Sequence, residues 1–209
     1  IMARYRDASC RLCRREKMKL MLKGERCLTA KCAITKKREV PGPTNRKMKQ
    51  LSEYGIQMRE KQKVKRIYGI LEKQFRNYYH EANRVAGVTG ENLLRLLELR
   101  LDNVVYRLGL AKSRAQARQF VQHGFINVNG KTMSVPSYSM KVGDKVSFSQ
   151  RGNSITQVKE LLDGLKSEYV PAWLSLDLSA KQGEIVTLPI REHIEYPINE
   201  QLIIEYYSK

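Results

Sequence analysis

Apolar residues recur at helical spacing along the first half of the chain. Over residues 46–86 they return every three or four positions, as on one helix face, with Gly55 and Gly69 as weak points. A second stripe follows Thr89, a good N-cap, and predicts one long helix that Gly109 ends. The members of this second stripe are Leu93, Leu97, Leu101, Val104 and Leu108.

A shorter helix and a hairpin are predicted next. Ser113 is expected to cap a helix that runs to about Gln122, with Gly124 as its C-terminal stop. Together with the long helix before it, this helix forms a helix-turn-helix-like unit. Residues 125–133 predict a β-hairpin, because Asn129-Gly130 supplies the two positive-φ positions of a type I′ turn.

The rest of the chain alternates between short strands and helices. The expected elements are a strand in 142–148, a helix in 155–165, strands at 174–176 and 185–187, and a helix over 200–207 that Asn199 caps. Two prolines around a glycine predict a linker at 40–45. This mixture of helices and short strands indicates an α+β fold.

The composition excludes several classes of protein. The 209 residues include 39 Lys and Arg against 21 Asp and Glu, for a formal net charge of +18, and 42% of them are hydrophobic, which is enough for a packed core. No apolar run approaches the ~18 residues of a membrane helix. No apolar stretch follows the first charged residues, as it would in a secretory signal. We therefore expect a cytoplasmic protein with a polyanionic partner, of which nucleic acid is the commonest.

The positive charge is spread unevenly. Residues 1–50 carry a net +12, residues 51–100 a net +4 and residues 101–150 a net +5, whereas residues 151–209 carry a net −3. A single basic run is usually a solvated surface, but three consecutive basic segments favour a surface that binds a polyanion. The nearly neutral last quarter is expected to be structural.

All four cysteines lie near the start of the chain, with the spacing C-x2-C-x13-C-x4-C. Two such pairs can complete a tetrahedral zinc site, here with one Zn²⁺ held by Cys10, Cys13, Cys27 and Cys32. The segment has few large apolar residues, so the metal would supply folding free energy. Nearby cations favour the thiolate form: Arg11, Arg14, Arg15 and Lys31. An iron–sulfur cluster and free thiols are the alternatives, since disulfides are disfavoured in a protein that is not exported.

The shorter helix has one basic and one apolar face. Arg114, Arg118 and Gln122 are four residues apart, and the opposite face is expected to pack on the longer helix through Ala117, Phe120 and Val121. The helix N-terminus, with Lys112 and Ser113, favours a phosphate. If the hairpin folds back, the same edge carries His123, Asn129 and Lys131. An ordinary amphipathic helix with solvated arginines is the alternative.

A second basic run covers residues 59–66 and includes Lys63, Lys65 and Arg66. Tyrosines follow it at positions 68, 78 and 79. Aromatic rings among cations can stack on exposed bases. Burial of these tyrosines between helices explains them equally well.

The whole chain resembles the bacterial small-subunit ribosomal protein S-four family. The likeness is carried by the opening Ala3-Arg4-Tyr5-Arg6, by Gly42-Pro43 and above all by the block 99–109. It continues through 113–118, 122–124, 128–130, 171–174 and 204–207. The cysteine set resembles the metal-bearing version of the family.

The resemblance implies three parts. They are a metal-binding N-terminal segment and linker in 1–45, a helical domain in 46–88 plus 198–209, and an α+β domain in 89–197. The α+β domain would contain an RNA-binding module at about 99–163, with the helix-turn-helix-like pair packed on an antiparallel sheet. Such modules also occur in some RNA-modifying enzymes and in a tRNA synthetase.

The resemblance also implies a function and partners. The family binds 16S rRNA at a multi-helix junction of the 5′ domain and nucleates assembly of the small subunit. Its members neighbour ribosomal proteins S-three, S-five and S-twelve and the mRNA entry channel, affect accuracy, and in some cases repress their own translation. No small-molecule substrate is implied. The candidate RNA contacts are Arg4, Tyr5, Arg6, Arg14, Arg15, Arg46, Lys47, Lys63, Lys65, Arg66, Lys112, Ser113, Arg114, Arg118, His123, Asn129 and Lys131.

Two other classes compete with this interpretation. Arg100-Leu101-Asp102 resembles the segment that carries the catalytic aspartate of some pseudouridine synthases, but the triplet lies inside a predicted apolar-striped helix. Asp102 is more simply an ion-pair partner for nearby arginines, and no nucleophile–base set is present, so the sequence favours a protein that is not an enzyme. A DNA-binding regulator would use one exposed recognition helix, whereas the broad charge favours a large structured RNA.

Overall fold

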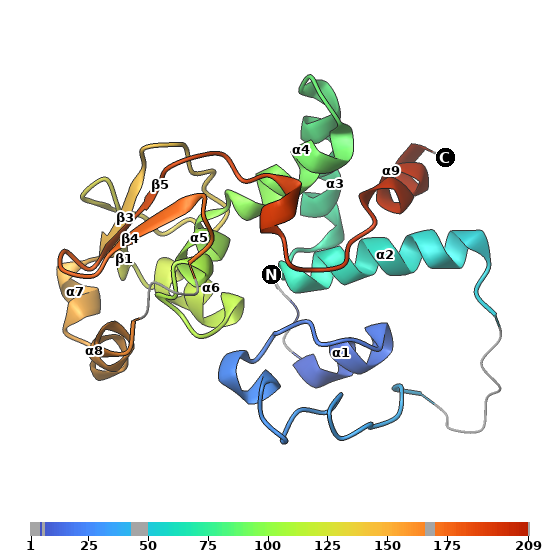
Figure 1. Cartoon of the computed structure of the whole chain (residues 1–209), viewed down its shortest axis with the longest axis horizontal. Coiled ribbons are helices and arrows are strands. Elements are labelled where there is room, and N and C mark those ends of the chain that lie inside the picture. The colour runs from blue at the N-terminus through green and yellow to red at the C-terminus, as the bar shows by residue number, and fades with distance from the viewer. Residues whose placement is uncertain (1–4, 6, 43–49, 166–169, 209) are drawn as a thin grey trace. The chain divides into compact units, whose positions relative to one another are not determined.

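The computed structural model describes residues 5, 7–42, 50–165 and 170–208 (Figure 1). Among the predicted RNA contacts, four lie outside the described residues: Arg4, Arg6, Arg46 and Lys47. Contacts between residues divide the chain into two compact units, Ile1–Leu93 with Tyr196–Lys209, and Leu94–Glu195. The cysteine segment and the helices that follow it therefore belong to the first unit, and the predicted three-part division stays a prediction.

The first unit is helical in its described part. Its helices are α1 (Ser9–Glu16), η1 (Gly24–Cys27), α2 (Glu53–Ile67), α3 (Glu72–Arg84), the start of α4 (Thr89–Glu98) and α9 (Glu200–Ser208). The last helix packs along α2, where Gln57 Nε2 donates to Glu205 Oε2 at 2.9 Å. The predicted cap of α9 is confirmed, since Asn199 Oδ1 accepts from the Leu202 amide at 3.5 Å.

The helical pattern predicted over 46–86 is confirmed in the described part of the segment, with a break at Gly69, one of its two predicted weak points. The described part of this segment contains two helices, α2 and α3, because Gly69 adopts φ +66°, a left-handed conformation that ends α2. The apolar period holds on either side of the break, where Val64, Ile67 and Phe75 are fully buried. It fails at Leu51, before α2, and at Leu71, before α3, because both side chains are exposed.

The long helix predicted after Thr89 is also interrupted. Arg100 has an extended backbone that forms a β-bridge with Ser139, and α5 (Leu101–Arg107) starts after it. The Leu101 amide at the start of α5 donates to the Tyr138 carbonyl at 2.9 Å, so the loop carbonyl replaces a helical acceptor. The predicted stripe survives the break, because all five of its residues are buried.

The shorter helix and the hairpin are confirmed. Ser113 caps α6 (Arg114–Gln122) by accepting from the Gln116 amide at 3.3 Å, and Gly124 follows the helix at φ +70°. Strands β1 (Ile126–Val128) and β2 (Lys131–Thr132) pair antiparallel across a turn in which Asn129 and Gly130 both have positive φ.

The sheet of the second unit has five strands in the order β2-β1-β3-β5-β4, all antiparallel. The remaining strands are β3 (Lys145–Phe148), β4 (Leu174–Asp177) and β5 (Gln182–Ile185). The strand predicted at 185–187 thus lies earlier, because Asp177 Oδ1 accepts the Ser179 and Ala180 amides and makes a tight turn after β4.

Short helices and one core complete the second unit. The helices are α7 (Gln150–Asn153), α8 (Thr156–Asp163), which confirms the prediction for 155–165, and η3 (Arg191–His193). Helices α5 and α6 share a core with the sheet and α8, and the fully buried Trp173 lies in it. The predicted helix-turn-helix-like pair on an antiparallel sheet is therefore present.

Candidate nucleic-acid interface

Charged side chains are buried beneath the helix pair α5–α6. The Glu98 carboxylate, 1% exposed, accepts from Arg107 Nε at 3.1 Å and from Arg107 NH2 at 3.0 Å. It also accepts from Asn103 Nδ2 at 2.6 Å, and Asn103 Oδ1 in turn accepts from Arg114 Nε at 2.8 Å. This chain of hydrogen bonds satisfies a buried charge and fixes the base of α6 against α5.

A second cluster centres on Asp102. Arg100 contacts it in a bidentate pair, with Nε at 3.0 Å and NH2 at 2.8 Å from the two carboxylate oxygens. Arg118 NH1 reaches the same carboxylate at 3.3 Å, and Arg118 Nε has no hydrogen-bond partner within the described ranges. One carboxylate therefore faces two guanidinium groups, so this cluster keeps a net positive charge.

Arg114 lies deeper than predicted. It is only 9% exposed, and its guanidinium carbon stands 4.4 Å from the centroid of the Tyr106 ring. The alternative of solvated arginines is therefore wrong for Arg114, and Ala117, Phe120 and Val121 are buried as predicted. The i, i+4 spacing was correct, but the partners of Arg114 come from α5, which the spacing could not indicate.

Exposed polar groups surround the helix pair. Lys112, His123 and Lys131 are exposed, and the His123 ring stacks on Phe125 with centroids 5.5 Å apart. Arg151, which sequence reasoning missed, lies with its guanidinium carbon 5.8 Å from the same phenyl centroid. The sequence does show an aromatic residue, Phe125, between the candidates His123 and Lys131. It could not show that Arg151 lies near that ring, because the two residues are twenty-six positions apart.

Asn129 and Ser113 have structural partners. Asn129 Nδ2 donates to Asp144 Oδ1 at 2.8 Å, and its Oδ1 accepts from the Lys145 amide at 2.9 Å. Ser113 Oγ caps α6. Both residues therefore shape the elements on which the exposed cations stand, and their RNA contacts stay predictions.

The basic run of α2 is largely paired with acidic residues of its own unit. Lys65 contacts Glu72 at 2.8 Å, Lys63 contacts Glu60 at 2.7 Å, and Arg66 pairs with Glu16. Tyr68 and Tyr79 are buried. Much of this charge thus serves packing, in agreement with the alternative that places these tyrosines between helices.

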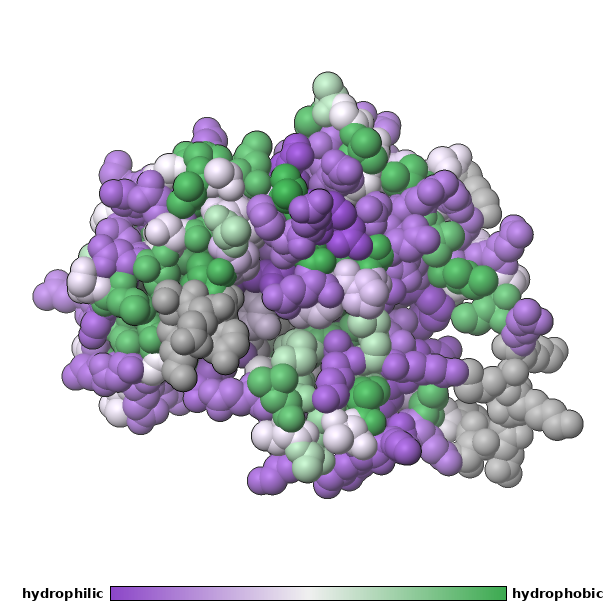
Figure 2. Space-filling view, in the orientation of Figure 1, coloured by the Kyte–Doolittle hydropathy of each residue, from purple (hydrophilic) through white to green (hydrophobic). Residues whose placement is uncertain are grey.

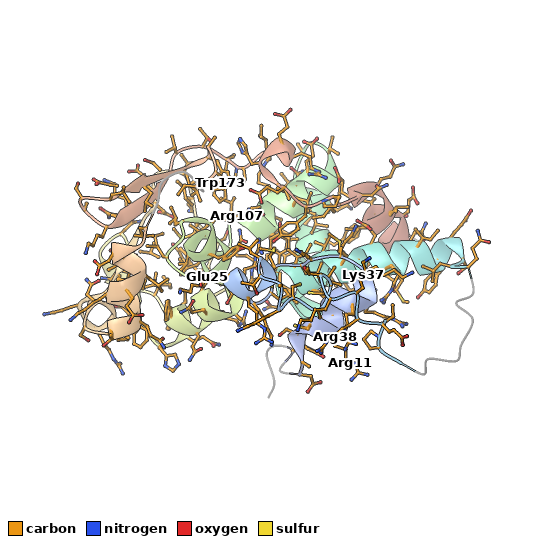
Figure 3. The ribbon with its side chains drawn as sticks, turned by 60° about the horizontal axis from the view of Figure 1, so that its bottom comes forward. Arg11, Glu25, Lys37, Arg38, Arg107 and Trp173 are labelled. Carbon is orange, nitrogen blue, oxygen red and sulfur yellow. The ribbon has the colours of Figure 1, made fainter. Side chains whose placement is uncertain are left out.

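The cysteine segment carries the densest exposed charge of the first unit. Arg14 reaches the Glu39 carbonyl at 2.9 Å, but other cations point to solvent: Arg11, Arg15, Lys17, Lys19, Lys23, Arg26, Lys31, Lys36, Lys37 and Arg38. Figure 3 shows Arg11, Lys37 and Arg38 projecting around this segment. Hydrophilic residues line its outer edge in Figure 2.

The four cysteines line one small cavity of about 10 Å³. Cys10 and Cys13 lie one turn apart on α1, Cys27 ends η1, and Cys32 follows it. All four are free thiols. Over the ranges that the structure describes, no group of three or more His, Cys, Asp or Glu is arranged to hold a metal ion. The zinc site therefore stays a prediction.

Backbone amides and burial act differently on these thiols. The Lys23 amide lies 3.4 Å from Cys27 Sγ. Hydrogen bonding from the Thr35 backbone lowers the pKa of the Cys32 thiol, whereas burial raises the pKa of Cys13.

Comparisons with known proteins cover the entire chain. Residues 4–98 match the model of the ribosomal protein S4/S9 N-terminal domain, and residues 99–146 match the S4 domain. The chain is 56% identical to small ribosomal subunit protein uS4A of Alkaliphilus metalliredigens over 208 residues, with both chains covered completely. The chain belongs to the uS4 family of small ribosomal subunit proteins.

Other relatives in this family agree. The uS4 proteins of Geotalea daltonii and Geobacter sulfurreducens are 54% and 55% identical over 208 residues, again with both chains covered completely. The family resemblance predicted from the sequence is thereby confirmed. These relatives are named as ribosomal proteins and not as enzymes, and Asp102 is engaged by Arg100 and Arg118 as an ion-pair partner.

No helix in the described ranges is both long and apolar enough to span a membrane.

Proposed function

We propose that the protein is a structural constituent of the small ribosomal subunit, a cytoplasmic particle, and that it binds 16S rRNA. The full-length identity of 54–56% to proteins named for that subunit carries the proposal. The exposed cations of the cysteine segment and the helix pair support it, because a large RNA offers phosphates to both units.

The geometry supports binding by charge and shape. Asp102 holds Arg118 in place, and Lys112, Lys131 and Arg151 are exposed cations of the same unit that phosphates can approach. Each phosphate that is neutralised releases counterions, which makes the affinity depend on salt. The folded units then hold the RNA helices at set angles, and this organises the sites of later proteins during assembly.

Competition binding tests this function. Full-length protein should retain binding to the 16S 5′ domain in the presence of excess duplex DNA or tRNA, and its affinity should fall about 10³-fold or more from 50 to 200 mM salt if six or more phosphates are contacted. Equal displacement by all competitors would contradict it. Turnover of uridine in the RNA would instead support the enzyme alternative.

The proposal also covers the neighbouring ribosomal proteins and the mRNA. We propose that ribosomal proteins S-three, S-five and S-twelve and the mRNA entry region lie beside the bound protein, with effects on accuracy and, in some settings, on its own translation. An exposed apolar group supports a protein contact: Leu51, Tyr54 and Ile56, with the Tyr206 ring 5.5 Å from that of Tyr54. Photocross-linking from position 54 in assembled subunits identifies the neighbour, and cross-links to RNA alone would contradict a protein contact.

We propose further that the four cysteines hold one Zn²⁺, with an iron–sulfur cluster as the alternative. The chemistry of the four free thiols and their place around one cavity, whose volume is about that of one water-sized sphere, support this proposal. Zinc would crosslink α1, η1 and the segment after it, and supply folding free energy. The cations of the segment offset the charge of the thiolates.

Elemental analysis after reducing, chelator-free purification should find about one zinc per chain. A chelator should then lower Tm of the wild type, whereas Cys27→Ser protein should bind little zinc and show no further chelator effect. If the analysis finds iron and labile sulfide, the site holds an iron–sulfur cluster and not zinc. If it finds no metal, the proposed metal site is contradicted.

A further inference from the structure

A pocket of about 380 Å³ opens on the first unit beside α1. Its walls combine three guanidinium groups and one carboxylate with an aromatic ring, a proline and a leucine, and the lining residues are Arg11, Arg15, Arg66, Asp7, Tyr5, Pro41 and Leu12. The Tyr5 side chain is 42% exposed, so its ring is accessible from solvent. Figure 3 shows Arg11 on the outer side of α1.

The pocket keeps a net positive charge. Neither Arg11 nor Arg15 has an ion-pair partner among the residues that the structure describes. Arg66, by contrast, forms an ion pair with Glu16. Glu16 also contacts Arg59 at 3.3 Å. The Glu16 side chain is buried, so it fixes Arg66 at the pocket wall and does not line the opening.

The volume of the pocket and the chemistry of its lining indicate which class of ligand it can bind. Sites for small organic ligands have volumes of about 300–1,000 Å³, so this pocket is larger than one phosphate needs. A ring and a proline offer flat apolar surfaces to a base, and guanidinium groups bind phosphate and also stack on base planes. Duplex RNA keeps its bases stacked inside, so only an unpaired nucleotide can enter.

We propose that this pocket receives one unpaired, unstacked nucleotide of the RNA, with its base against Tyr5 and its phosphate against Arg11 and Arg15. The inference rests on the proposed RNA-binding function. It adds Arg11 to the contacts predicted from the sequence and gives the cysteine segment a contact that depends on single-stranded structure.

Affinity for the transcribed 16S 5′ domain tests the pocket, with full-length protein and three variants. Tyr5→Leu should weaken binding about tenfold and leave the slope of log K against log salt unchanged, because it removes stacking but no charge. Arg11→Gln should weaken binding and reduce that slope by about 0.7–0.9. Tyr54→Leu is the matched control, an exposed tyrosine outside the pocket, and should bind as the wild type does.

Chemical probing of unpaired bases gives the second readout. One nucleotide that wild-type protein protects should become reactive with Tyr5→Leu and stay protected with Tyr54→Leu. If wild type fails to bind, the proposed function fails. If wild type binds and Tyr5→Leu has wild-type affinity and protections, the pocket proposal is overturned, and loss with Arg11→Gln alone would mean that the pocket takes phosphate only.

Discussion

Replacing Glu98 with alanine is expected to lower the free energy of unfolding by about 3–5 kcal/mol, which is the usual cost of leaving a buried charge without its partner. Arg107 would lose both bonds of its bidentate pair, at 3.0 and 3.1 Å, and Asn103 would lose its acceptor at 2.6 Å. Chemical denaturation followed by circular dichroism measures the loss.

A second, exposed acidic partner of Arg107 provides the control for this prediction. Its NH1 also lies 3.9 Å from the Glu195 carboxylate, whose side chain is 81% exposed. Glu195→Ala should therefore cost less than about 1 kcal/mol, as exposed ion pairs do. Equal losses for the two alanine variants would show that burial of Glu98 does not set the energetics of this cluster.

Replacing Asp102 with alanine is expected to reduce both stability and RNA affinity. Arg100 is 1% exposed and would lose the carboxylate that pairs with its buried charge, a change that costs about 3–5 kcal/mol. Arg118 would lose the carboxylate that holds it at 3.3 Å, so its contact with phosphate would lose its fixed geometry. Denaturation and filter binding measure the two effects separately.

Arg118→Gln separates binding from folding. The Arg118 side chain is more exposed than that of Arg100 and its contact with Asp102 is longer, so this variant should lose less stability than Asp102→Ala does. It should still weaken RNA binding and reduce the salt slope by about 0.9. Wild-type affinity and slope for this variant would remove the helix pair from the interface.

Local signals predicted the hairpin and the caps well, because each depends on a few adjacent residues. Asn129-Gly130 allows a turn with two positive φ angles, and Ser113 accepts a helix amide, whatever the rest of the chain does. The helix break at Arg100 could not be predicted in this way. It depends on carbonyls of residues 136 and 138, which are distant in sequence.

The interface was predicted in part for a similar reason. Charge along the sequence located the basic segments, but it could not show which cations are paired. Glu16 and Glu72 engage cations of α2, and Asn103 and Tyr106 bury Arg114, whereas Lys112 stays exposed. Partners of this kind arise from tertiary packing between elements, which periodicity and composition do not specify.

Footprinting on naked 16S rRNA tests the central claim most directly. The full-length protein alone, without other ribosomal proteins, should protect backbone positions grouped around one multi-helix junction of the 5′ domain, and the protections should weaken together as salt rises. Protections scattered along the RNA without preference for a junction, or none until other ribosomal proteins are added, would contradict the proposal that this protein binds the RNA directly and early.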